Sequence, residues 1–204
     1  FRSWGGEDLE LAFRLFRRGV RFAVSRAGWA VEAPHPRAVA PDLRSNSANI
    51  LMFLHKHPDP VVELLWAWFA REQTGFEIHH EWHVEDEYRL VLDAAAHARP
   101  VDVTGELDRL RPLAGRARIA VLGCGGDVPD WLAGAALFDF DRDLIDRAGP
   151  RACHAVGIRT PLADGAVDLV FITSRLRGLW PRWRDEILAE ARRIGADIRG
   201  PLLG

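Results

Sequence analysis

The N-terminal half of the chain has the hydrophobic pattern of separate helices. Between residues 6 and 19, apolar side chains recur at a spacing of three to four positions, as in Leu9, Phe13 and Phe16. Acidic residues open this stretch, arginines close it, and Gly19 follows as a helix stop. Further helices are predicted over 46–56, over 60–70 behind an Asp-Pro cap, and over 84–98.

From residue 118 onward the pattern changes to short apolar runs that alternate with helical stretches. The runs RIAVLG, ALFDFD and DLVFIT have the character of buried strands. Helices are predicted between and after them, the longest over WRDEILAEARRIG. This alternation predicts an α/β fold with a parallel, doubly wound sheet. Because the chain stops soon after the last of these helices, we expect the sheet to be partial.

Composition and charge narrow the class of protein. The 204 residues are 48% hydrophobic and 27% charged, which is ordinary for a globular protein and excludes a disordered chain or a fibre. With 27 basic and 29 acidic residues, the charge is too balanced for a nucleic-acid partner. No apolar run reaches the roughly 18 residues of a transmembrane helix. Two cysteines cannot form a disulfide framework, so we expect a reduced, cytoplasmic setting.

Two adjacent acids, Glu7 and Asp8, stand at the start of the first predicted helix, behind Trp4, Gly5 and Gly6. The glycines let the backbone approach a ligand closely, and the indole offers a flat apolar face for a sugar ring. A carboxylate placed here can take the proton of an attacking hydroxyl. The alternative is that the acids only complement the helix dipole.

The segment WGGEDLELAFRLFRRGVRFAVSRAGWAVEAPHPR resembles the C-terminal part of inverting glycosyltransferases of the GT-A fold. The resemblance is strongest to the galactosyltransferase C-terminal segment and its bacterial family-2 relatives. Those families carry W-G-x-E-D, a helix of the E-L-x-x-R-L type, a turn and strand, and then H-x-x-H or M-x-x-H. The resemblance covers about residues 1–65. It implies transfer of a sugar from a nucleotide-sugar donor to a hydroxyl acceptor.

The same resemblance assigns roles to individual residues. It implies that Asp8 is the general base and that Glu7 binds the acceptor beside it. His35 would be a ligand of Mn²⁺ or Mg²⁺, and Glu32 stands where the family has a second ligand, His or Met. The acceptor site would be shaped by Trp4, Gly5 and Gly6. The nucleotide-sugar half of such a domain is not in this sequence, so we expect the isolated chain to be inactive and to belong to a longer parent.

A second candidate site follows the first strand of the C-terminal half. A glycine turn with Gly123 and Gly125 precedes a helix, and Asp139 ends the next strand, where an acid can bind ribose hydroxyls. This arrangement resembles class I S-adenosylmethionine-dependent methyltransferases over about residues 116–196. Asp127 replaces the third glycine, and Val121 replaces an acid near the turn. The alternative is therefore a scaffold that has lost its cofactor.

Together these observations predict three parts. Residues 1–70 would be the C-terminal segment of a GT-A glycosyltransferase, 71–115 an acidic helical linker, and 116–204 a truncated, Rossmann-like methyltransferase domain. The predicted function is sugar transfer with inversion by the full-length parent, with S-adenosylmethionine as a possible further cofactor. The alternatives are a methyltransferase and a non-catalytic interaction fragment.

Overall fold

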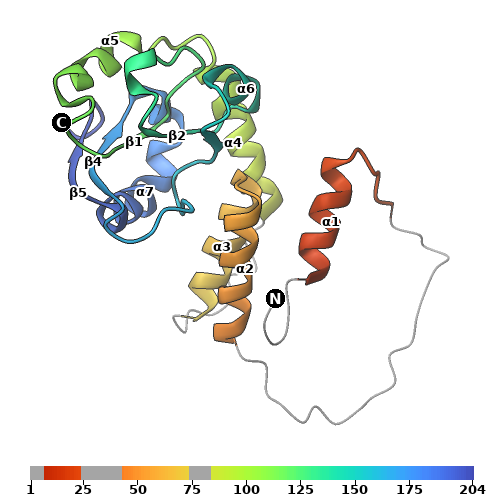
Figure 1. The fold of residues 1–204 in the computed structure, drawn as a ribbon. Helices are drawn as coiled ribbons and strands as arrows, with labels where there is room; N and C mark the ends of the chain where they lie inside the picture. The colour runs from red at the N-terminus through yellow and green to blue at the C-terminus, as the bar shows by residue number, and fades with distance from the viewer. Residues whose placement is uncertain (1–6, 24–42, 74–83) are drawn as a thin grey trace, which may run out of the picture.

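The computed structural model describes residues 7–23, 43–73 and 84–204. Its C-terminal part contains a parallel sheet of five strands in the order β3-β2-β1-β4-β5 (Figure 1). The strands are β1 (Ile119–Leu122), β2 (Ala136–Asp139), β3 (Ala152–His154), β4 (Val167–Ile172) and β5 (Gly195–Arg199). The strand order reverses between β1 and β4, as in Rossmann-like sheets. The predicted α/β class and parallel sheet are confirmed, and β3 and β5 extend it beyond the strands that the sequence predicts.

The central strand β1 is buried on both faces, which explains its continuous apolar run. Ile119 and Val121 face one core, and Ala120 and Leu122 face the other. The first core is covered by α5 (Thr104–Leu107) and the 3₁₀ helix Asp108–Leu113. The second is covered by α7 (Trp180–Ile194), on the opposite side of the sheet (Figure 1). The short helix α6 (Arg142–Ala148) joins β2 to β3.

Three further helices precede the sheet unit along the chain. They are α1 (Glu7–Arg17), α2 (Leu43–Lys56) and α3 (Pro60–Gln73). A small core joins them, in which Phe13 of α1 lies edge-on against Phe53 of α2, with ring centroids 5.3 Å apart. As predicted, Asp59 caps α3, because its Oδ1 accepts a hydrogen bond of 3.1 Å from the N–H of Val61.

Helix α4 (Val84–Ala98) joins these helices to the sheet. Its acids Glu85 and Asp86 are exposed, whereas its opposite face is buried in the core of the sheet unit through Val91, Ala94, Ala95 and Ala98. The same core includes Leu64 of α3. Within the predicted linker over 71–115, described residues of 84–115 thus contribute to the packing of the sheet unit. The functional division at residues 70 and 115 stays a prediction.

The longest helices that the structure describes, α4 and α7, have 15 residues each. None of the described helices combines the length and apolar character needed to cross a bilayer.

Candidate functional site

The two acids of the first candidate site lie at the beginning of α1. Glu7 is the first residue of the helix, and Asp8 is exposed in its first turn. The other predicted residues of this site, Trp4, Gly5, Gly6, Glu32 and His35, lie outside the described residues. Among the residues that are described, no group of three or more His, Cys, Asp or Glu side chains could hold a metal ion. The predicted metal site therefore stays a prediction.

One turn further along α1, Glu10 is buried and fixes the helix to the end of α2. Its Oε1 accepts a hydrogen bond of 2.8 Å from Lys56 Nζ and also lies 2.8 Å from His57 Nε2. Its Oε2 accepts a hydrogen bond of 3.0 Å from Arg14 Nε. The hydrogen bond from Lys56 lowers the pKa of Glu10 to about 2, with help from His57 and Arg14, although burial acts in the opposite direction. Glu10 is therefore an anchor of α1.

A second anchor connects the C-terminal end of α1 to the sheet. Arg17 Nη1 lies 3.2 Å from Asp59 Oδ2, and the same oxygen lies 3.3 Å from Nδ1 of His154 in β3. The other ring nitrogen of His154 lies 3.2 Å from the carbonyl oxygen of Phe140. Asp59 and His154 are both buried. The helix that carries Asp8 is thus held by α2, α3 and the sheet edge together.

Replacing Glu10 by Gln is expected to lower the free energy of unfolding by about 1.5–3 kcal/mol, the range for hydrogen bonds to a buried charged group. Because the folded-state pKa of Glu10 lies below the ordinary value, its stabilisation is complete above about pH 4.5 and is lost as the pH falls toward 2. Urea unfolding of both proteins at about pH 6 and about pH 3 measures this difference.

The matched control for Glu10 is Glu85→Gln on α4, since Glu85 pairs with Arg89 at 2.6 Å but is exposed. Its effect should stay within about 0.5 kcal/mol. Equal losses in the two variants would show that Glu10 is no anchor.

The predicted glycine turn lies where the sequence places it, directly after β1. Gly123 and Gly125 have φ values of +81° and +71°, which side chains rarely adopt. The N–H groups of Gly123 and Cys124 both donate to the carbonyl oxygen of Phe138 in β2, at 2.8 and 2.9 Å. A Cβ atom on Gly123 would lie 2.6 Å from Oγ1 of Thr173 after β4. The glycine therefore lets the turn pack closely against the end of β4.

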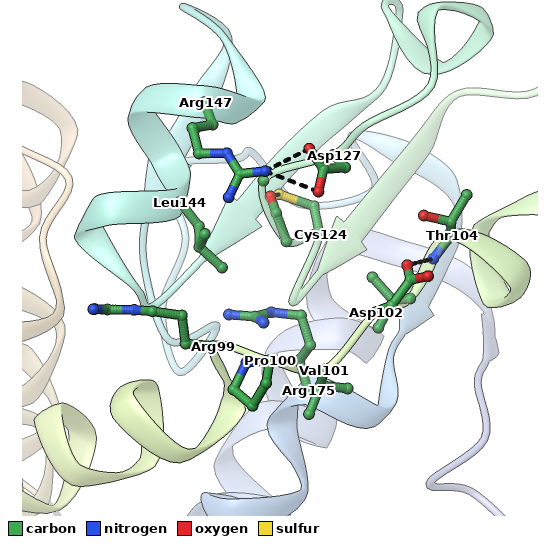
Figure 2. Close-up of a pocket in the computed structure, with 13 residues that line it drawn as sticks. Arg99, Pro100, Val101, Asp102, Thr104, Cys124, Asp127, Leu144, Arg147 and Arg175 are labelled. Carbon is green, nitrogen blue, oxygen red and sulfur yellow. Dashed lines mark hydrogen bonds and ion pairs between the residues drawn. The ribbon is translucent and has the colours of Figure 1, made fainter.

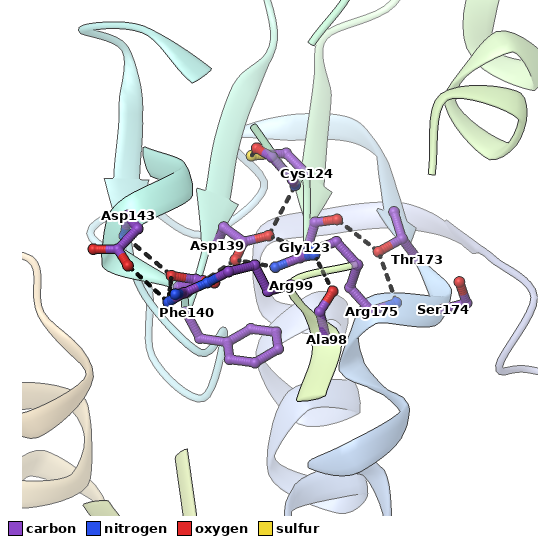
Figure 3. Close-up of polar contacts among 12 residues, drawn as sticks. Ala98, Arg99, Gly123, Cys124, Asp139, Phe140, Asp143, Thr173, Ser174 and Arg175 are labelled. Carbon is purple, nitrogen blue, oxygen red and sulfur yellow. Dashed lines mark hydrogen bonds and ion pairs between the residues drawn. The ribbon is translucent and has the colours of Figure 1, made fainter. Parts of the chain in front are cut away.

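Asp139 ends β2, as predicted, but its carboxylate is fully buried and bonded within the chain (Figure 3). Arg175 donates to both oxygens, from Nε at 2.8 Å and from Nη2 at 3.0 Å. The N–H groups of Gly125 and Asp141 donate to the same carboxylate at 2.8 and 2.9 Å. Sequence reasoning did not single out Arg175, because no motif marks an arginine that follows β4 as the partner of an acid after β2.

A cavity of about 110 Å³ lies beside the glycine turn (Figure 2). Arg147 and the buried Arg175 both line it, and Arg147 pairs with Asp127 at 2.7 Å. Burial raises the pKa of the Cys124 thiol, so this cysteine is a neutral packing residue and not a nucleophile. Binding sites for small molecules commonly have volumes of about 300–1,000 Å³. These residues therefore do not fit S-adenosylmethionine, because the cavity is small and the ribose-binding oxygens of Asp139 are already bonded.

No family model matches this chain. It is similar over its whole length to two curated proteins that both bear the name validoxylamine A glucosyltransferase. One is from Streptomyces hygroscopicus subsp. jinggangensis (strain 5008) and the other from Streptomyces hygroscopicus subsp. limoneus, and each is 35% identical over 217 residues. The alignments cover 100% of this chain and 50% and 46% of the two relatives. The chain thus spans about half the length of the curated relatives it matches.

The names of both relatives place them among the glycosyltransferases, the class that the WGGED segment resembles. More narrowly, the names specify glucosyl transfer, whereas the sequence resemblance is strongest to a galactosyltransferase segment. Because the alignments include all of this chain, they extend over both the helical part and the sheet unit.

Proposed function

We propose that this chain is part of a glycosyltransferase that moves a sugar from a nucleotide-sugar donor to a hydroxyl acceptor with inversion. The observation that carries the proposal is the 35% identity, over the whole chain, to two proteins named as glucosyltransferases. The position of Glu7 and Asp8 at the start of an anchored helix supports it. Since the relatives are about twice as long, the activity belongs to the full-length protein. By the relatives' names, the sugar is glucose and the acceptor is validoxylamine A or a similar molecule.

In this proposal Asp8 is the general base. The acceptor oxygen attacks the anomeric carbon while its proton passes to the Asp8 carboxylate. The bond between that carbon and the diphosphate oxygen breaks on the opposite face, and its electron pair leaves with the nucleoside diphosphate. This in-line geometry requires the acceptor oxygen within about 3–3.5 Å of the carbon. The exposure of Asp8 leaves its carboxylate accessible to an acceptor, and the anchors at Glu10 and Arg17 fix the helix that carries it.

A divalent ion is part of the proposal. Glu32 and His35 would hold Mn²⁺ or Mg²⁺, for which carboxylate and imidazole are suitable ligands. When bound, the ion would offset the charge that develops on the leaving diphosphate.

The test is a transfer assay with the full-length protein, a nucleoside diphosphate glucose as donor and validoxylamine A as acceptor. Mass spectrometry should detect a glucosylated product, and nuclear magnetic resonance should show inverted configuration at the anomeric carbon. A chelator should lower the rate, and added Mn²⁺ should restore it. A parallel reaction with S-adenosylmethionine as the only donor tests the alternative. A methylated product without sugar transfer would replace this proposal with a methyltransferase.

A further inference from the structure

The carboxyl edge of an open parallel sheet is where such folds bind their ligands, near the point at which the strand order reverses. In this chain the reversal lies between β1 and β4. We propose that the chain's own side chains fill this edge, so that the sheet anchors helices α3, α4 and α5 in place of a nucleotide cofactor. The inference goes beyond sugar transfer and does not depend on it.

The ion pair of Asp139 and Arg175 occupies the edge after β2 and β4. Both side chains are 0% exposed, and the pair has two hydrogen bonds. The remaining terminal nitrogen of Arg175, Nη1, donates to the carbonyl oxygen of Ala98 at 2.6 Å (Figure 3). Arg175 therefore links Asp139, the acid predicted to bind ribose, to Ala98, the last residue of α4. Through these contacts α4 is joined to the sheet.

The loop after β3 is filled from α3. Four consecutive backbone N–H groups, those of residues 156–159, point at the carboxylate of Glu63. Three of them donate to Oε1 at 2.9–3.1 Å, and Glu63 is fully buried. Successive N–H groups of this kind form a concave site that suits an anion. In this protein the carboxyl group of Glu63 is the acceptor for these N–H groups, and it joins α3 to the sheet.

The loop after β4 also donates hydrogen bonds to a carboxyl group from a helix. Glu106 of α5 accepts a hydrogen bond of 2.9 Å from the N–H of Ser174 and a second one from its hydroxyl. After each of β1, β3 and β4, at least one backbone N–H group thus donates to a carboxyl group of the chain, namely Asp139, Glu63 and Glu106 respectively. The cavity that remains at the glycine turn has about 110 Å³, well below the volume of a nucleotide site.

Calorimetric titration of the chain with S-adenosylhomocysteine and with NAD⁺ tests the inference. We expect no saturable heat and no shift of Tm with either probe, because Arg175 already bonds the Asp139 carboxylate and Glu63 already accepts the N–H groups after β3. Saturable binding of either probe by the wild-type chain, lost in Asp139→Asn, would overturn the inference.

A stability measurement tests the anchoring role separately. Arg175→Met leaves the buried Asp139 charge unpaired and is expected to lower Tm by roughly 6–20 °C. Arg175→Lys keeps the positive charge but not the paired hydrogen bonds, so it should fold with a smaller loss. The matched control is Arg177→Met, two residues further along and exposed, whose Tm should equal that of the wild type. Equal Tm values for the wild type and Arg175→Met would contradict the anchoring role.

Discussion

Replacing Asp8 by Asn in the full-length protein is expected to reduce the turnover of sugar transfer by about 10²–10⁴-fold, the contribution typical of a general base. Asn has nearly the shape of Asp but cannot accept the hydroxyl proton. The loss should therefore fall on kcat, while KM for the acceptor changes little. Steady-state rates with donor saturating and acceptor varied measure both constants.

The fold should not change in the Asp8 variant, because the side chain is exposed in the first turn of α1. Its Tm should equal that of the wild type. Asp93→Asn, which neutralises an exposed acid on α4, is the matched control and should keep full turnover. If Asp8→Asn retains wild-type turnover, Asp8 is not the base, and Glu7 becomes the next candidate.

Removing the Glu63 carboxylate is expected to have the largest effect on stability. Glu63→Ala leaves the four N–H groups of residues 156–159 without their acceptor, in a region where all but Arg159 are fully buried. A buried unsatisfied donor costs about 1–3 kcal/mol, so the loss should reach about 4 kcal/mol or more. This is a large share of the roughly 5–15 kcal/mol that stabilises a typical domain. Urea unfolding monitored by circular dichroism measures it, and a loss below about 1 kcal/mol would contradict the anchoring of α3.

The stability of the fold is also expected to depend on pH through Glu63. The variant Glu63→Gln, which keeps nearly the shape of the side chain, tests this expectation. Burial raises the pKa of Glu63 to about 8, although the N–H donors of Val156, Arg159 and Gly157 act in the opposite direction. Between the ordinary value of 4.5 and about 8, the folded chain holds one proton more than the unfolded chain. Stability should therefore fall as the pH rises through this window, by at most about 1.4 kcal/mol per unit. In Glu63→Gln this decrease of the free energy of unfolding with pH should be absent. If the decrease is the same as in the wild type, another titratable group causes it.

Much of the fold follows from local sequence. The helix predicted over 84–98 matches α4, and Gly19 follows α1 with a φ of +79°. Asp59 caps α3 as its position before Pro60 predicts. Each of these features depends on neighbouring residues, whose chemistry is visible in a short stretch of sequence.

The parts that the sequence did not predict depend on distant partners or on short elements. Strand β3 has three residues, Ala152–His154, and β5 begins directly at the end of α7, so neither has a separate apolar run. For the candidate cofactor site, the sequence predicts the position of Asp139 but not its partner, because Arg175 lies 36 residues away. The glycine turn and the acid can be recognised from local sequence. Whether a ligand or a side chain of the protein bonds the acid depends on residues far away in the chain.

The contact between Glu63 and the loop after β3 also has a consequence for biosynthesis. The donors lie 93 to 96 residues further along the chain than the carboxylate they bind. At about 5–20 residues per second, a ribosome needs roughly 5–20 s to make this stretch. Throughout that interval Glu63 remains hydrated, and its neighbour Leu64 lacks the sheet against which it is buried in the finished protein. The emerging chain therefore leaves Glu63 and Leu64 of α3 without their partners in the sheet unit until the loop after β3 has left the ribosome.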